Sequence, residues 1–271
     1  MTTTVTDALL LRAVDYGERD RVVTLLTADL GKVSAMARGA RTSRRRFAGA
    51  LEPFTWMRVQ LRAGRGELVR LESAEPVRTY PALLGRLDAM RCAGAALEAC
   101  REIVAPRDPD RRLFEAATQM LEAMQGEGAP VLETLLAFCS RLTALAGLAP
   151  RLDACGRCGR VAPERGAARF DPALGALLCS RCGHGPILLS AATRAMLQGA
   201  CSGTWTRSVQ PLEPTERAAG LMAVAAHLRV RLNRTLHGLG GLVERVCGDR
   251  ADSMADPVDD SSREPGPCAE S

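Results

Sequence analysis

Two pairs of cysteines constrain this chain more than any other feature of its sequence. Cys155 and Cys158 lie in the segment CGRC, and Cys179 and Cys182 lie in CSRC, with twenty residues between the pairs. This spacing is at the upper edge of the range that zinc sites show. Each C-x2-C segment forms a tight turn that directs two thiolates to one point, and two such turns supply the tetrahedral sulfur shell that suits Zn²⁺. We therefore expect these four residues to hold one zinc ion.

The expected zinc ion is structural rather than catalytic. Four thiolates fill the coordination sphere, so no position remains for water or a substrate. A redox C-x2-C motif is the main alternative, but such a motif normally occurs once, near the start of a helix. Five other cysteines lie in apolar helical settings and are predicted to be small core residues: Cys92, Cys100, Cys139, Cys201 and Cys247.

Residues 6–80 have the pattern of short β-strands. Segments such as RVVTLLTADLGK are rich in Val, Leu and Thr and are separated by turn signals such as DYGERD. The run FTWMRVQLR alternates strictly, which is typical of a half-buried strand. Its apolar face carries Met57, Val59 and Leu61, and its other face carries Phe54, Trp56, Arg58, Gln60 and Arg62. About five strands in so short a segment predict a small closed barrel, because closure removes exposed edges.

After Pro81 the apolar residues recur at intervals of three and four, which predicts helices. Three segments, 81–104, 109–124 and 130–148, each begin at or near a proline, as first turns of helices often do. The third carries an apolar stripe that is predicted to lie in the core: Leu132, Leu135, Leu136, Cys139, Leu142 and Leu145. Helical spacing is lost over 151–186 and returns at 190–199 and 214–239.

The charge of the chain is unevenly distributed. Residues 249–271 hold seven acids and two arginines, a local charge of −5. Since the whole chain has a net charge of +5, the remaining residues carry +10. A basic body with an acidic tail predicts a polyanionic partner, with solubility alone as the alternative. The tail has no periodic apolar residues, and we expect it to be disordered. The basic charge is densest in ARGARTSRRRFAG (37–49), which holds Arg38, Arg41, Arg44, Arg45 and Arg46.

The sequence favours a binding protein over an enzyme. It has three histidines, no G-x-S-x-G, Walker A, H-E-x-x-H or dinucleotide fingerprint, and no acidic pair suited to acid–base catalysis. No stretch approaches eighteen uncharged apolar residues, and the first twenty residues lack the regions of a signal peptide. We therefore expect a cytoplasmic protein with no membrane segment, in whose reducing surroundings paired cysteines bind metal.

Four segments of the chain together match the pattern of a known family. They are LLLRAVDYGERDRVVTLLTADLGKVSAMARGAR, RRRFAGALEPFTWMRVQLRAGRGELVRLESAE, FCSRLTALAGLAPRLDACGRCG and RFDPALGALLCSRC. In these segments the chain resembles the bacterial RecO family of recombination mediators. Gly147, Pro150 and Phe170 stand where the family has a Gly-x-x-Pro before its zinc cysteines and an aromatic segment before the second pair. These motifs occur in the family's order, over roughly residues 6–237.

The resemblance implies an α+β multidomain fold: an N-terminal OB-fold β-barrel, an α-helical bundle, and a four-cysteine zinc module inserted in the helical region. We place the barrel at 1–80, the two helical parts at 81–150 and 187–248, the zinc module at 151–186, and the tail at 249–271. The resemblance also implies binding of single- and double-stranded DNA, annealing of complementary strands, and a place at the nucleoid. The implied partners are RecR, the C-terminal tail of the single-strand binding protein SSB, and indirectly RecA during its loading.

OB-folds bind single strands by combining a basic groove with stacking aromatic residues. The expected DNA contacts on the barrel are Lys32, Arg38, Arg41, Arg44, Arg45, Arg46, Arg58 and Arg62, with Trp56 as a stacking residue. The alternative for Trp56 is that its ring closes one end of the barrel. The chain departs from the family at Leu236-His237-Gly238-Leu239, where the family often has a Leu-Lys-Ser-Arg-like segment. Arg231 and Arg234 could substitute there, or could belong to a solvated helix surface.

Two other functions are compatible with the sequence. An OB barrel with a basic loop and a zinc ribbon also suits an RNA-binding or ribosome-associated protein. A pure adaptor, with the helical region as its docking site, is the second alternative. An enzyme that acts on nucleic acid is disfavoured, because neither an open metal site nor a cluster of carboxylates is visible in the sequence.

Overall fold

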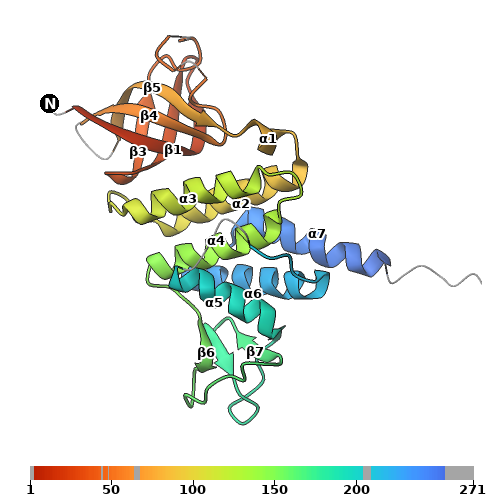
Figure 1. Cartoon of the computed structure of the whole chain (residues 1–271). Coiled ribbons are helices and arrows are strands. Elements are labelled where there is room, and N and C mark those ends of the chain that lie inside the picture. The colour runs from red at the N-terminus through yellow and green to blue at the C-terminus, as the bar shows by residue number, and fades with distance from the viewer. Residues whose placement is uncertain (1–2, 44, 48, 64–67, 204–208, 254–271) are drawn as a thin grey trace, which may run out of the picture.

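The computed structural model describes residues 3–43, 45–47, 49–63, 68–203 and 209–253. Arg44 and residues 254–271 of the predicted tail lie outside the described residues. A β-barrel lies at one end of the molecule, helices form its middle, and a small sheet lies at the opposite end (Figure 1). The predicted fold class is confirmed, including the insertion of the cysteine-bearing module between two helices. No helix among the described residues is long and apolar enough to cross a membrane.

The N-terminal domain is an OB-fold. Its five strands are β1 (Thr3–Tyr16), β2 (Asp20–Thr27), β3 (Gly31–Ala37), β4 (Thr55–Arg62) and β5 (Val69–Thr79). They close in the order β1-β2-β3-β5-β4, with β1 paired to β4 and β3 running parallel to β5. The predicted alternation of β4 is confirmed, because Met57, Val59 and Leu61 are buried inside the barrel while Arg58 is exposed.

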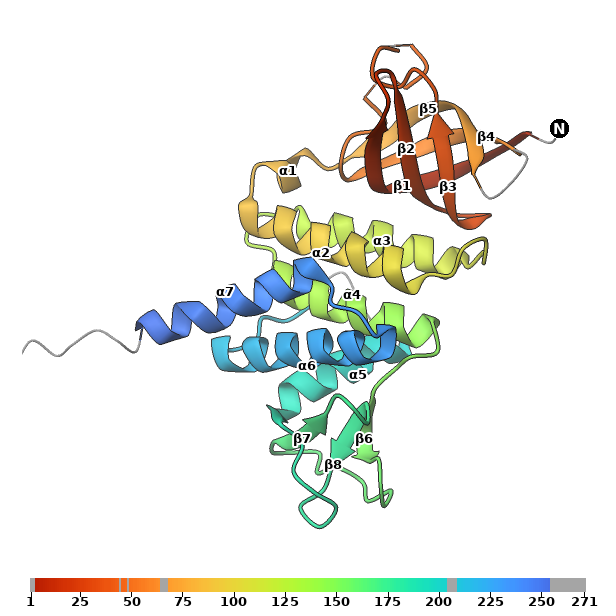
Figure 2. The same cartoon turned by 180° about the vertical axis from the view of Figure 1, so that it is seen from behind.

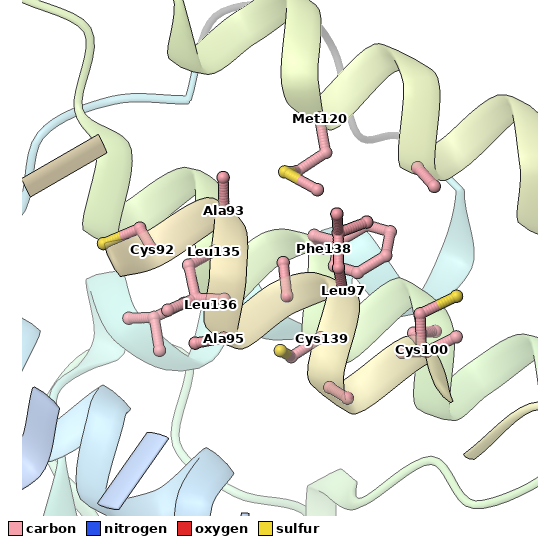
Figure 3. Close-up of a cluster of buried hydrophobic side chains, with 14 of the residues drawn as sticks. Cys92, Ala93, Ala95, Leu97, Cys100, Met120, Leu135, Leu136, Phe138 and Cys139 are labelled. Carbon is pink, nitrogen blue, oxygen red and sulfur yellow. The ribbon is translucent and has the colours of Figure 1, made fainter. Parts of the chain in front are cut away.

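The helical region packs around one central helix. The helices are α1 (Pro81–Leu84), α2 (Leu87–Ile103), α3 (Arg111–Met124), α4 (Val131–Leu145), α5 (Ala191–Ser202), α6 (Pro214–Leu232) and α7 (His237–Ser253). Helix α4 is buried on nearly every side, so its apolar residues form more than the single predicted stripe. Figure 3 shows Leu97 of α2, Met120 of α3 and Phe138 of α4 meeting in this core.

Two predicted helices are each divided in two. The segment 81–104 breaks at Gly85, and the segment 214–239 breaks where Asn233 adopts a left-handed conformation with φ of 49°. The second break permits α7 to turn and pack against α2. The Glu98 carboxylate of α2 accepts hydrogen bonds from the backbone N–H groups of His237 and Gly238, at 3.1 and 2.7 Å. These bonds satisfy donors that a helix start otherwise leaves unpaired.

The start of α7 also explains why the chain has Gly238. A Cβ at this position would lie 2.8 Å from the Cα of Ala95, so the two helix backbones approach as closely as glycine permits. The departure from the family pattern therefore falls at a helix contact. Helix α7 continues to Ser253, four residues past the predicted start of the tail, since an established helix extends at little cost.

The cysteine-bearing module is a small four-stranded sheet. Its strands are β6 (Arg151–Cys155), β7 (Ala168–Asp171), β8 (Ala176–Leu178) and β9 (Ile187–Leu189), in the order β6-β8-β7-β9. Strand β9 extends the module past the predicted end at residue 186. The buried Arg194 of α5 fastens the module by donating to the carbonyls of Pro163 and Gly166, at 2.6 and 3.0 Å.

Candidate metal centre and nucleic-acid interface

The four cysteines predicted as zinc ligands meet at one point of the small sheet. Their sulfur atoms all lie within 4.8 Å of one another, and Cys158 Sγ is 3.6 Å from Cys179 Sγ. Cys155 comes from the end of β6 and Cys179 follows β8, and these two strands are neighbours in the sheet. The arrangement could hold one metal ion with four thiolate ligands.

The backbone around the cysteines forms the two expected tight turns. Gly159 and Gly183 have φ of 74° and 140°, conformations that side chains rarely adopt, and the Cys182 N–H donates to the Cys179 carbonyl at 2.9 Å. Hydrogen bonds from backbone N–H groups, first that of Cys158, lower the pKa of the Cys155 thiol to about 6. Oriented N–H groups favour the thiolate, which is the form that binds metal.

The predicted arginine loop connects β3 to β4 at the end of the barrel that points away from the helices (Figures 1 and 2). It is fastened to the turn of the β1–β2 hairpin. Arg41 N–H donates to the Arg19 carbonyl at 3.1 Å, and Gly39 N–H donates to the Asp20 carboxylate at 2.7 Å. The hairpin turn and the described part of the loop therefore form one surface, which we call the barrel tip (residues 12–22, 36–43 and 45–47).

The described arginines of the loop are exposed but differ in their partners. Arg41 forms an ion pair with Asp15 at 3.5 Å, and Arg46 donates to the Arg38 carbonyl at 2.7 Å while lying over the ring of Phe47. Among the described residues, no acid lies within ion-pair distance of Arg38 or Arg45. These two side chains are thus the most available of the predicted set for contact with phosphate.

Two of the predicted DNA contacts lie instead between the barrel and the helices. Lys32 Nζ donates to the carbonyl of Arg101 at the end of α2, and burial lowers the pKa of this lysine. Trp56 is half-buried and packs edge-on against Phe114 of α3, with ring centroids 5.7 Å apart. Neither contact was expected from the sequence. Lys32 complements the negative end of helix α2, and the Trp56 indole packs between the barrel and the helices.

Phe54 is also unavailable for stacking, since it is 6% exposed. Arg58 and Arg62 lie on the β4 side of the barrel. Arg58 is paired with Asp7 of β1, and Arg62 is paired with Glu72 of β5 at 3.3 Å. On this side the barrel pairs its arginines with acids, whereas Arg38 and Arg45 at the tip have no acidic partner among the described residues.

Arg231 and Arg234, which could substitute for the family's basic segment, lie in different settings. Helix α6 ends at Leu232, so Arg234 lies beyond it and forms an ion pair with Glu102 of α2. Arg231 turns the other way and donates to the Leu174 carbonyl in the cysteine module at 2.8 Å. Arg234 thus links the segment after α6 to α2, and Arg231 links α6 to the cysteine module.

Comparison with known proteins gives matches along most of the chain. The family model described as Recombination protein O N terminal matches residues 1–80, and Recombination protein O C terminal matches residues 84–239. The chain belongs to the RecO family.

Its RecO relatives include the DNA repair protein RecO of Anaeromyxobacter sp. (strain K), which is 46% identical over 233 residues. That alignment covers 84% of this chain and 91% of the relative. DNA repair protein RecO of Myxococcus xanthus (strain DK1622) is 42% identical, over 83% of this chain and 93% of the relative. That of Geobacter metallireducens is 36% identical, over 86% and 96% respectively.

Sequence reasoning missed one exposed aromatic residue of this RecO chain, Tyr16, which is 61% exposed at the end of β1. Two signals pointed to it. Aromatic residues make up only 3% of the chain, and Tyr16 stands in the turn signal DYGERD, where a hairpin exposes its side chains.

Proposed function

We propose that this protein is a non-catalytic mediator of DNA repair and recombination. It binds single- and double-stranded DNA, anneals complementary strands, and helps RecR to load RecA on single strands coated with SSB. It acts in the cytoplasm, at the nucleoid. Membership of the RecO family supports this function. The observation that carries the DNA contact is that Arg38 and Arg45, at the tip of an OB barrel, have no acidic partner among the described residues.

The central test is an annealing assay on complementary strands coated with SSB, with and without RecR. The protein is expected to accelerate duplex formation, and RecR is expected to change how the protein and SSB share the strand. No acceleration on either bare or coated strands would contradict the proposal.

The contact with phosphate is tested by the salt dependence of binding to a single strand. Each neutralised phosphate contributes about 0.7 to the slope of log K against log salt. The double variant Arg38→Ala/Arg45→Ala is therefore expected to lower the slope by about 1.4. Arg58→Ala/Arg62→Ala is the matched control, because it removes the same charge from arginines that are already paired with acids. Equal slopes for the two double variants would exclude the tip as the contact.

We further propose that the four cysteines hold one structural Zn²⁺, since a sulfur shell of four ligands leaves no position for a substrate. Elemental analysis of the purified protein is expected to give one zinc per chain. Cys158→Ser is expected to lower both the zinc content and the melting temperature while DNA affinity persists. Less than half a zinc per wild-type chain would refute the assignment.

An RNA-binding function is the second candidate, because an OB barrel with a basic tip also accommodates RNA. Competition between DNA and RNA strands of one sequence separates the two functions. Preference for the DNA strand is expected, and preference for the RNA strand would favour the alternative.

A further inference from the structure

The outer surface of the β1–β2–β3 sheet carries an apolar strip at the barrel tip. In antiparallel strands, residues directly opposite each other point to the same side of the sheet. Val14 lies opposite Val22, and Val22 lies opposite Met36. Tyr16 lies opposite Asp20, two positions farther along the same side. Tyr16, Val14, Val22 and Met36 therefore share one side of the sheet, which we call the tip strip.

The helices cover part of this side, around Leu9 and Leu26, but leave the strip open. Closer to the helices, Leu9 of β1 and Leu26 of β2 are opposite each other and belong to the core that the barrel shares with the helical region. The strip begins beyond that contact. Tyr16 is 61% exposed and Val14 is 43% exposed, while Val22 and Met36 are partly exposed. This side of an OB-fold, with the β1–β2 turn, is where such barrels bind oligonucleotides.

Arginines border the strip. Arg12 lies opposite Thr24 on the same side as Val14 and Tyr16, and Arg38 follows Met36 by two residues. Both are exposed, and neither forms an ion pair with an acid in the described part of the chain. A narrow apolar surface with unpaired cations at its edges matches a single strand, which presents flat bases beside a phosphate backbone.

We propose that Tyr16 is a base-stacking residue of the single-strand site, with Val14, Val22 and Met36 beneath the neighbouring base and Arg12 and Arg38 at the phosphates. This inference rests on the DNA binding proposed above. Tyr16 is the one exposed aromatic side chain in the described residues, because the five phenylalanines and Tyr80 are buried and Trp56 is half-buried beside Phe114.

The experiment measures fluorescence anisotropy of two probes, a labelled oligo(dT) and an abasic strand of the same length and charge. Wild type is expected to bind the oligo(dT) more tightly than the abasic strand. Tyr16→Ala is expected to weaken oligo(dT) binding by about five-fold or more, the contribution typical of one stacked base. It should leave binding of the abasic strand and the salt slope unchanged, because tyrosine carries no charge. Tyr16→Phe should retain wild-type behaviour, since it keeps the ring.

Val5→Ala is the matched control, because Val5 is 59% exposed at the opposite end of the same strand. If wild type binds oligo(dT) but Tyr16→Ala keeps both its affinity and its preference for bases, the stacking role is overturned while the DNA-binding function stands. If wild type binds neither probe, the proposed function fails and the stacking role with it. If Tyr16→Ala instead dissociates a dimer in sedimentation without changing DNA affinity, the strip is an interface between copies and the inference is wrong.

Discussion

His227 of α6 is buried beside the cysteine module and the chain that follows α4. Nε2 donates to the Leu148 carbonyl at 2.8 Å, while Nδ1 is buried without a hydrogen-bond partner in the described structure. The ring borders a small cavity whose other lining includes Phe170 and Leu197. Burial lowers the pKa of His227, the Leu148 bond opposes this, and nearby Arg231 lowers the pKa further.

This histidine predicts a loss of stability on acidification. Below a pH of about 6.5 the unfolded chain binds a proton at this residue, whereas the folded chain with its lowered pKa does not. The contribution of His227 to stability is therefore present above the unfolded pKa of about 6.5 and is lost as the pH falls from there through the lowered folded pKa. His227→Gln keeps a donor for Leu148 but does not titrate. Urea unfolding at pH 5, 6 and 7 should give a smaller pH dependence for the variant, and identical pH dependences would contradict the argument.

For single residues, the sequence predicts which side chains come together within a local motif better than it predicts which side chains stay exposed. The spacing of the four cysteines indicated that their sulfur atoms meet, because local turn geometry determines that result. The spacing could not show that Trp56 would pack on Phe114, or that Lys32 would bond to Arg101, since these contacts join segments far apart in the chain. Exposure was equally hard to predict from the sequence, since Tyr16 was overlooked although it is 61% exposed.

Among the elements, the contact of α7 with α2 depends on a glycine. Gly238→Ala is expected to destabilise the fold by about 1–3 kcal/mol, the usual cost of adding a methyl group to a tightly packed contact. The added Cβ would lie 2.8 Å from a backbone atom of Ala95 and beside the Glu98 carboxylate that caps the helix. Thermal unfolding measures the effect.

Gly241→Ala in the same helix is the control, because apart from the backbone of its own helix no described atom lies within 4 Å of the added Cβ. It should leave the melting temperature unchanged or raise it, since alanine favours helix over glycine by about 1 kcal/mol. Equal destabilisation by both substitutions would mean that the contact with α2 is unimportant.

Element types followed from the sequence because the period of the apolar residues changes clearly at Pro81. Element ends were harder to predict. The break at Asn233 is set by a left-handed residue and by a cap that Glu98 supplies from another helix, and neither is visible in the apolar pattern around residues 214–239. The strands of the small sheet are three to five residues long, too short for alternation to identify them.

Across the whole molecule, several contacts fix the barrel on the helices. Besides the Trp56–Phe114 contact, Arg78 pairs with Glu122 at 2.7 Å, and Arg111 lies 3.8 Å from Asp29. Exposed ion pairs of this kind contribute little, so apolar contacts hold the barrel in place: Trp56 on Phe114, and the buried core that Leu9 and Leu26 share with the helices.

Trp56→Ala is therefore expected to cost about 2–3 kcal/mol, somewhat less than the loss of a fully buried tryptophan. Limited proteolysis should then cut between the barrel and the helices earlier than in wild type. Trp56→Phe preserves an aromatic edge and serves as the control. A Trp56→Ala protein with unchanged melting temperature and cleavage pattern would show that other contacts hold the barrel in place.

The docking of the barrel has a consequence for how strands can meet. The tip points away from the helices, and the cysteine module lies at the far end of the molecule (Figure 1). A barrel docked in this way keeps the tip and the cysteine module of one chain at a fixed separation. If the tips bind DNA as proposed, complementary strands on two separate molecules have no such restriction. Annealing of strands bound at the tips would then require two protein molecules to meet, and its rate would increase with the protein concentration.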